Sequence, residues 1–255
     1  MTRISGFWPT DSTASCSPDI ASTDGLVCAV HQPNLFPRLS TLAKLFTADV
    51  WIVLDDVQFA RRDYQHRALL APTVGAPGPS RWLSIPTRLP AGRATLIRDA
   101  RMAEPVRSRR RTADLLREHY RTTPYWAVFK ERLDRLLDLF ERTDRTGTVA
   151  QESTLLLLSM VGWTGRVVVS SDLEASTGRS QRLVDLCSAV GADTYLCGTG
   201  GMRYIEPAVF DRAAIELRPF TVQNGSLWNG ASRTSAVAAL TAYGPQRLAE
   251  LLRRG

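Results

Sequence analysis

The sequence lacks any apolar run long enough to cross a bilayer, which takes about 20 residues in a helix. Residues 154–161 are apolar but far too few. Residues 1–24 are rich in Ser, Thr, Asp and Pro and have no apolar h-region, so they do not form a secretory signal. We therefore expect a flexible leader followed by a soluble protein with no membrane insertion.

Cysteine is scarce, and its spacing excludes two classes of small protein. The four cysteines are Cys16, Cys28, Cys187 and Cys197, and no two of them form a CxxC pair. This spacing supports neither a zinc site nor a disulfide framework, so we expect no metal held by the protein alone. Free cysteines also point to a reducing, cytoplasmic location.

Positive charge is in modest excess and is almost entirely arginine. Lys plus Arg number 32 against 25 acidic residues, which gives a net charge of +7. This balance slightly favours an anionic ligand. The basic run 107–111 has no interleaved aromatic residues and reads as an exposed helix face, so nucleic acid is not an expected partner. The oligomeric state is left open.

The order of apolar segments predicts one α/β protein with a mostly parallel, Rossmann-like sheet. Expected strands cover residues 26–30, 50–54, 81–87, 96–102, 167–169, 194–197 and 216–220. Helical spacing appears in residues 37–48, 104–120, 125–142, 149–163, 180–190 and, as a pair broken at Gly244-Pro245, 232–252. We divide the chain into a leader (1–24), an N-terminal α/β part (25–103), a helical segment (104–163) and a C-terminal α/β part with closing helices (164–255). The helical segment is expected to be an insertion or a cap over the working edge of the sheet.

Two of these strands end in polar residues with reactive side chains. His31, Gln32 and Asn34 follow the first strand, and the second strand is followed by Asp55, Asp56 and Gln58. The ligands of open parallel sheets bind beyond the carboxyl ends of the strands, so both groups are site candidates. A dense polar segment, RRDYQHR at 61–67, comes next along the chain.

These segments resemble the signature of the WbqC-like family, a bacterial group associated with polysaccharide and natural-product gene clusters. HQPNLFP, DDVQF and RRDYQHR form the first block, and SQRLVDLCSAVGADTYLCGTGGMRYIEPAVF is similar to the second. The resemblance spans residues 26–220 and implies work on amino sugars or related small molecules. The chain has Arg38 where the family tends to have an aromatic residue, and His66 where it tends to have Asn.

A looser resemblance is to the nucleotidylyltransferase superfamily, and to pantothenate synthetase in particular. The strand, His-containing loop, helix and Q-F dipeptide occur in the same order, and a stretch from Tyr195 to Tyr204 adds to the likeness. It implies an acyl-adenylate made with ATP and Mg²⁺. Asn34, however, stands where the HxGH motif of that superfamily has its second His.

His31 has two interpretations. It fixes the Pro33-containing loop by a hydrogen bond, or it donates to a phosphoryl or carboxylate oxygen of a ligand. Asp55 and Asp56 point to opposite faces if they extend the strand, so one braces the fold while the other binds a nucleotide-bound metal or takes a proton from an amine. The candidate catalytic residues are His31, Asp55, Asp56 and Arg62.

The remaining candidates bind substrate or nucleotide. Arg62 and Arg67 suit phosphate or carboxylate, because a guanidinium group binds such anions in two-pronged fashion. Glycines after the strand at 194–197 allow a backbone to approach a phosphate, whereas tight turns need glycine anyway. Ser180 opens the helix at 180–190 and is expected to cap it, or to bind an anion there. The full set is Gln32, Asn34, Gln58, Gln65, His66, Arg67, Ser180, Arg182, Tyr195, Gly198, Gly200, Gly201 and Tyr204.

Two functions of different class follow. The first is an enzyme that activates or transfers an acyl or aminoacyl group onto an amine of a small molecule or amino sugar, with ATP and Mg²⁺ as the cofactors of an adenylate route. The second is a non-catalytic accessory protein that binds a sugar nucleotide or an intermediate attached to a carrier protein. Both require His31, Asn34, Asp55 or Asp56, Gln58, Arg62, Gln65 and residues 198–201 to converge on one pocket.

Overall fold

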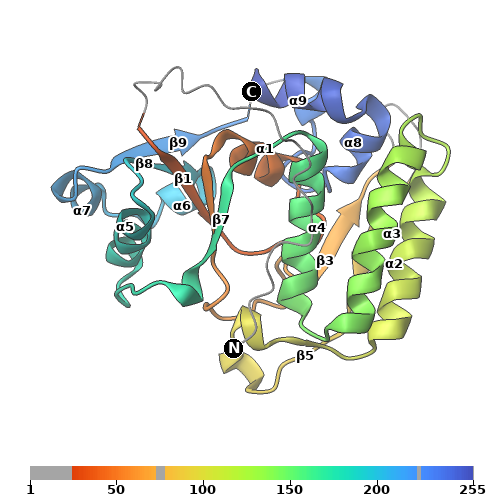
Figure 1. The fold of residues 1–255 in the computed structure, drawn as a ribbon, viewed down its shortest axis with the longest axis horizontal. Coiled ribbons are helices and arrows are strands. Elements are labelled where there is room, and N and C mark those ends of the chain that lie inside the picture. Colours follow the sequence, from red (N-terminus) through yellow and green to blue (C-terminus); the bar gives the residue numbers. More distant parts are fainter. Residues whose placement is uncertain (1–24, 73–77, 223–224, 255) are drawn as a thin grey trace, which may run out of the picture.

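A five-stranded sheet forms the centre of the molecule in a computed structural model that describes residues 25–72, 78–222 and 225–254 (Figure 1). All neighbouring strands pair in parallel. Their order is β7-β2-β1-β8-β9, with bounds β1 (Val27–His31), β2 (Val50–Val53), β7 (Arg166–Val169), β8 (Thr194–Gly198) and β9 (Glu216–Phe220). The predicted parallel α/β sheet is confirmed, with β1 and β2 adjacent as expected.

Side chains of β1 alternate between two apolar cores, one on each face of the sheet. Ala29 belongs to the core shared with α1 (Leu39–Thr47) and α4 (Thr146–Met160), whereas Cys28 and Val30 face α5 (Arg179–Val190) and α7 (Pro207–Arg212). Figure 1 shows α5 and α7 separated from α1 and α4 by the strands. Because both faces are covered, the strands read as continuous apolar runs.

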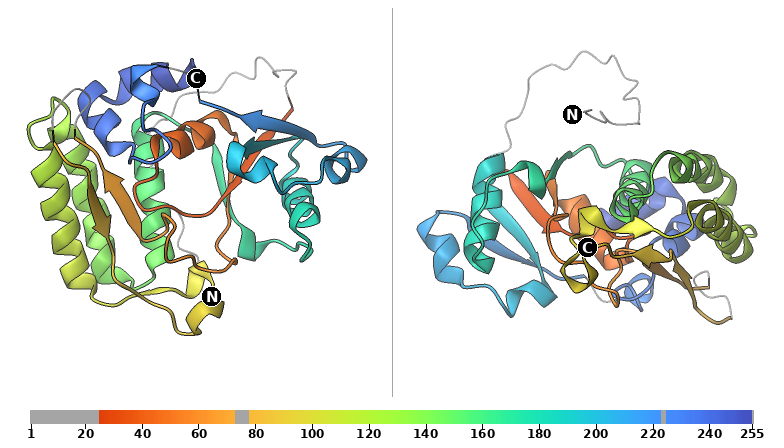
Figure 2. Two further views of the ribbon diagram at one scale, coloured as in Figure 1. Left: turned by 180° about the vertical axis from the view of Figure 1, so that it is seen from behind. Right: turned by 90° about the horizontal axis from the view of Figure 1, so that it is seen from below.

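The three helices predicted between residues 104 and 163 are present as α2 (Pro105–Tyr120), α3 (Trp126–Arg142) and α4. They pack in sequence, α2 on α3 and α3 on α4, and α4 also contacts α1. They stand beside the sheet in both views of Figure 2. Of the two predicted alternatives, an insertion or a cap over the working edge, the position of these helices favours the insertion, because none of their described residues lines the pocket found at that edge.

Two small antiparallel pairs replace the strands predicted at 81–87 and 96–102. β3 (Arg67–Leu70) pairs with β4 (Arg81–Ser84), and β5 (Thr87–Arg88) pairs with β6 (Arg101–Met102). Pro86 separates β4 from β5, and the 3-10 turns η1 (Gly92–Ala94) and η2 (Ile97–Asp99) precede β6. β3 was not predicted, since residues 68–70 are uniformly buried and show no alternation.

The closing helices are α8 (Val237–Tyr243) and α9 (Pro245–Arg253), a pair broken at the predicted Gly244-Pro245. Gly244 has φ 80°, and an added Cβ would lie 2.6 Å from the Tyr125 ring, so only glycine fits. Short helical turns η3 (Ser170–Asp172), α6 (Thr199–Met202) and η4 (Ser226–Trp228) complete the chain. None of the helices in the described ranges has the length and apolar character of a membrane span. The predicted leader, with Cys16, lies outside the described residues.

Candidate functional site

A pocket of about 900 Å³ lies at the carboxyl ends of β1 and β8. From β1 the chain adds strands on one side (β2, then β7), and it then returns to add β8 and β9 on the other. β1 and β8 therefore flank the topological switch point, where ligands of open α/β sheets bind. Eight of the predicted site residues line this pocket: His31, Gln32, Asn34, Tyr195, Gly198, Gly200, Gly201 and Tyr204.

His31 is the last residue of β1, and one side of its ring is already engaged. Its Nδ1 lies 2.7 Å from the carbonyl oxygen of Gln32, which can only accept, so Nδ1 carries the proton. Burial and then the charge of Lys44 lower the pKa of His31 to about 3. The imidazole is thus neutral at pH 7, and its Nε2 accepts hydrogen bonds. The interpretation of His31 as a donor to a ligand oxygen is therefore replaced by that of an acceptor.

Gln32 and Asn34 are held by buried neighbours on the far side of the loop. Gln65, which is fully buried, donates to the Gln32 side-chain oxygen at 2.7 Å and accepts from the Ala60 N–H at 2.9 Å. The backbone carbonyl of Asn34 accepts from the Thr154 hydroxyl at 2.8 Å. Gln65 therefore orients a pocket residue and does not line the pocket itself.

Lys44 is a pocket residue that sequence reasoning missed. Its side chain is 6% exposed, and its Nζ donates to the Val30 carbonyl at 3.3 Å. Burial lowers the pKa of Lys44 to about 8; Cys197 partly offsets this effect and the charge of Arg38 adds to it. The composition contained one signal that could have identified this residue. Lys44 and Lys130 are the only lysines among the 32 Lys and Arg residues of the sequence.

Arg38 supplies a second cation to the pocket. Its guanidinium group stacks on the Tyr64 ring at 4.4 Å and donates through Nη1 to the Ser232 carbonyl at 3.1 Å. Together with Ser40, Thr41 and Lys44, it places the start and the polar face of α1 against the pocket. A polar helix face normally faces solvent, which is why the sequence did not reveal this one.

The loop after β8 forms the opposite wall. A Cβ on Gly201 would lie 2.8 Å from the Cys197 sulfur, so this glycine is required by packing. Tyr195 is buried and stacks on Phe210 with ring centroids 5.5 Å apart. Tyr204 is 63% exposed at the rim.

The two aspartates after β2 form a different cluster. β2 ends at Val53, so the chain turns and both carboxylates reach the same element instead of opposite faces. Asp56 accepts from the Ser170 hydroxyl at 2.6 Å and from Arg182 at 2.5 Å. Burial would raise the pKa of Asp56, but these two partners hold it below its ordinary value. Asp55 accepts from the Ser171 hydroxyl at 3.0 Å. Both aspartates and Arg182 brace the β2 edge against η3 and α5, outside the pocket.

The polar segment after that edge also lies outside the pocket. Gln58 is exposed and donates to the Arg93 carbonyl, and the backbone carbonyl of exposed Arg62 accepts from Arg67. The Arg67 guanidinium group stacks on Trp82 at 4.4 Å. Of the residues predicted to converge, Asp55, Asp56, Gln58, Arg62 and Gln65 are not among those that line this pocket. The further candidates His66, Arg67, Ser180 and Arg182 do not line it either.

His66 and Ser180 have structural surroundings. Burial lowers the pKa of His66 to about 4, and its ring lies 5.2 Å from that of Phe59. Ser180 lies inside α5, whose N-cap is Gly178, so the predicted cap is wrong. Its hydroxyl instead accepts from the Glu206 N–H at 3.0 Å, which ties α5 to the start of α7.

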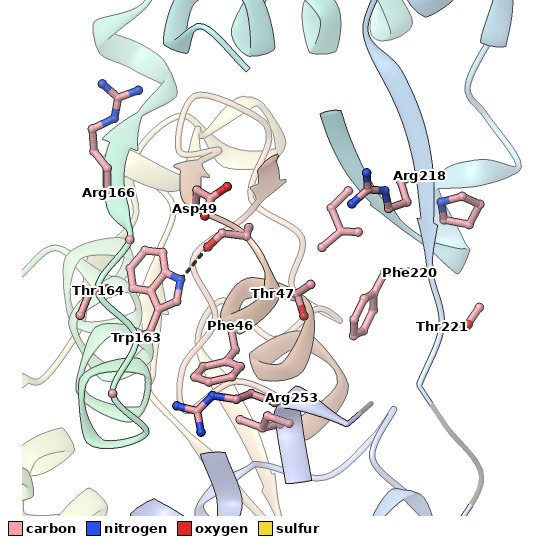
Figure 3. Close-up of a pocket in the computed structure, with 16 residues that line it drawn as sticks. Phe46, Thr47, Asp49, Trp163, Thr164, Arg166, Arg218, Phe220, Thr221 and Arg253 are labelled. Carbon is pink, nitrogen blue, oxygen red and sulfur yellow. Dashed lines mark hydrogen bonds between the residues drawn. The ribbon is translucent and has the colours of Figure 1, made fainter. Parts of the chain in front are cut away.

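A second pocket of about 860 Å³ lies at the end of α1, between β7, β9 and α9 (Figure 3). Trp163 donates to the Ala48 carbonyl at 2.7 Å across its wall. Arg253 lies over the Phe46 ring at 5.7 Å, and Arg166 donates to the Val190 carbonyl at 2.8 Å. Its described lining includes none of the predicted site residues.

The described residues contain no group of three His, Cys, Asp or Glu side chains that could hold a metal ion. Fold and pocket together define an α/β protein with a parallel sheet and a pocket at its switch point. The model of the WbqC-like protein family matches residues 32–230, so the chain belongs to that family. An uncharacterized protein from Mycobacterium tuberculosis, Rv1507c, is 24% identical over 212 residues, which cover 79% of this chain and 87% of the relative. No solved structure matches the chain.

Proposed function

We propose that this WbqC-like protein is an enzyme of small-molecule biosynthesis that transfers an acyl or aminoacyl group onto an amine. The observation that carries the proposal is the state of His31. Its Nδ1 is fixed by the Gln32 carbonyl at 2.7 Å, which leaves the lone pair of Nε2 at the pocket. A neutral imidazole held in one tautomer presents an acceptor for the proton of an attacking amine.

The proposed acyl transfer needs one base, which takes a proton from the amine and passes it to the leaving group. The amine nitrogen attacks the acyl carbonyl carbon, and the C–N bond forms as the carbonyl π electrons move to oxygen. The nitrogen then loses its proton to His31 Nε2. The carbonyl re-forms as the leaving group departs with the bonding pair and takes the proton from the imidazolium. Lys44 and Arg38 stabilise negative charge on the bound molecules throughout.

The adenylate version requires sites for ATP and Mg²⁺, and the pocket meets only part of that requirement. Lys44 and Arg38 suit phosphate groups. Asp63 is the one carboxylate among the described residues that line the pocket, and Asn34 replaces the second His of the HxGH motif. These residues do not fit the ATP–Mg²⁺ site of that superfamily, so the proposed reaction takes an acyl donor that is already activated.

The test measures amide formation by mass spectrometry, with acyl thioesters as donors and a panel of amines and amino sugars as acceptors. We expect product with the native protein and a loss of about a hundredfold or more in His31→Ala, the range for a lost acid–base group. His66→Ala is the matched control, because His66 lies outside the pocket. ATP–pyrophosphate exchange with a panel of acids tests the adenylate route in parallel. Product formation that does not depend on His31 would contradict the proposal.

An accessory binding protein is the second candidate, and one observation favours it. A histidine with a pKa of about 3 is a weak base while the pocket is empty. In that case the same side chains would bind a sugar nucleotide or a carrier-bound intermediate without reaction. Binding of such a molecule by both the native protein and His31→Gln, with no turnover by either, would select this candidate.

A further inference from the structure

We infer that the pocket takes one small molecule that carries both an amine and an anionic group, with the anionic group against Lys44 and Arg38 and the amine against His31 and Asn34. This inference rests on the proposed function, since it names the class of the acyl acceptor. It follows from the hydrogen-bonding capacity that the pocket side chains leave unused.

The donors left unused are cationic. Lys44 is 6% exposed, yet its Nζ, which has three N–H groups, makes a single long hydrogen bond of 3.3 Å to Val30. The Nε of Arg38 is buried and has no partner among the described residues. Asp63 also lines the pocket, and its Oδ1 accepts from the Tyr64 N–H at 2.8 Å. Two neighbouring cations in a partly buried wall are complementary to one carboxylate or phosphate.

The acceptors left unused lie on the β1 side of the same pocket. Asn34 is 2% exposed, and its side-chain oxygen is buried without a partner among the described residues. A buried polar atom of this kind usually has a partner, so its lack of one here indicates that a ligand supplies it. His31 Nε2 is a second acceptor, because Nδ1 carries the proton. Two acceptors on residues that line the same pocket are complementary to an amine and its N–H groups.

The loop after β8 has room for such a ligand. Gly200 lines the pocket, and an added Cβ would meet nothing within 4 Å. It lies in the short helix α6, where glycine is less favourable than alanine, and it has no positive φ that would require glycine. Packing within the described chain therefore does not explain this glycine, whereas the close approach of a bound molecule does.

The test compares ligands that carry both groups with ligands that lack either the anionic group or the amine, with binding to the full chain measured by calorimetry. Glucosamine 6-phosphate is compared with glucosamine, and glycine, β-alanine and γ-aminobutyrate are compared with ethylamine and with propionate. We expect at least tenfold tighter binding of a member that carries both groups than of its partners. The first pair tests a phosphate and the second set tests a carboxylate at the cation pair.

Two variants separate this inference from a general preference for anions. Lys44→Met should remove the advantage of the anionic group, and Lys130→Met, which alters the other lysine on the exposed surface of α3, should retain it. Gly200→Ala should weaken binding without lowering the melting temperature. Equal binding of members with and without the anionic group, or an unchanged preference in Lys44→Met, would overturn the inference.

The outcome also distinguishes the inference from the proposed function. Selective binding of bifunctional amines without amide formation would support the inference and contradict the proposed acyl transfer. The opposite outcome has two parts: glucosamine is acylated as fast as its 6-phosphate, and no amino acid is acylated in preference to ethylamine. Together these results would support acyl transfer and contradict the inference.

Discussion

Replacement of Lys44 by methionine should stabilise the protein at pH 7. Burial lowers the pKa of Lys44 from 10.5 to about 8, so the folded state disfavours the charged ammonium. At about 1.4 kcal/mol per pKa unit, this difference corresponds to an upper limit of about 3 kcal/mol. Loss of the 3.3 Å hydrogen bond to the Val30 carbonyl offsets about 1 kcal/mol of this gain. Methionine keeps the length and apolar stem of lysine, so we expect a net gain of about 2 kcal/mol.

The gain should depend on pH in a defined direction. Below pH 8 both the folded and unfolded chains carry the Lys44 proton, and the full penalty applies. Between about pH 8 and 10.5 the folded chain has released the proton while the unfolded chain still holds it, so the native protein gains stability relative to the variant. The advantage of Lys44→Met should therefore shrink over this range.

Urea unfolding at pH 7 and pH 10, with the midpoint and slope recorded for each protein, measures the effect. Lys130→Met is the matched control, because Lys130 is half exposed and pairs with Asp134 at 2.6 Å one helical turn away. It should lose only about 0.5 kcal/mol or less at pH 7. A Lys44→Met protein that is less stable than Lys130→Met at pH 7, or whose gain is the same at both pH values, would refute the reasoning. A gain would show that Lys44 is kept at a cost in stability, as expected of a binding residue.

Three further results are expected. NMR titration of His31 should show a neutral ring at pH 7 with a pKa of about 3, and Lys44→Met should raise that pKa. Because the unfolded chain has a His pKa of about 6.5, the contribution of His31 to stability should fall as the pH drops below about 6.5. A pKa near 6.5 in the native protein would contradict the site electrostatics. Asp56→Asn should destabilise the protein by about 1–3 kcal/mol in urea unfolding, because it leaves the partly buried Arg182 without its charge partner. It should leave ligand binding unchanged if the cluster only braces the sheet. Tyr120→Phe should lower the free energy of unfolding by about 1 kcal/mol, measured by thermal unfolding, because the hydroxyl donates to the Ala71 carbonyl at 3.0 Å. A variant as stable as the native protein would show that water replaces this hydrogen bond.

The sequence alone predicted the parallel sheet and most of its elements. The five strands of the central sheet and the three helices between residues 104 and 163 follow from local patterns. An apolar run bounded by turns, or an apolar repeat of 3.6 residues, indicates which side chains are buried. It also predicted that His31, Asn34 and the loop after β8 meet at one edge, since parallel strands end on the same side.

Tertiary structure alone decided which polar residues meet and in what state. In the sequence, Asp55 and Asp56 follow a predicted strand as His31 does, yet contacts with Ser170 and Arg182 from distant segments direct them away from the pocket. Lys44 reads as part of a solvent-facing helix surface until β1 and β8 are placed beside it. The neutral state of His31 depends on burial and on Lys44, which lies 13 positions further along the sequence. Residue order cannot report these effects, because the field at a side chain is set by neighbours in space and by the water they exclude.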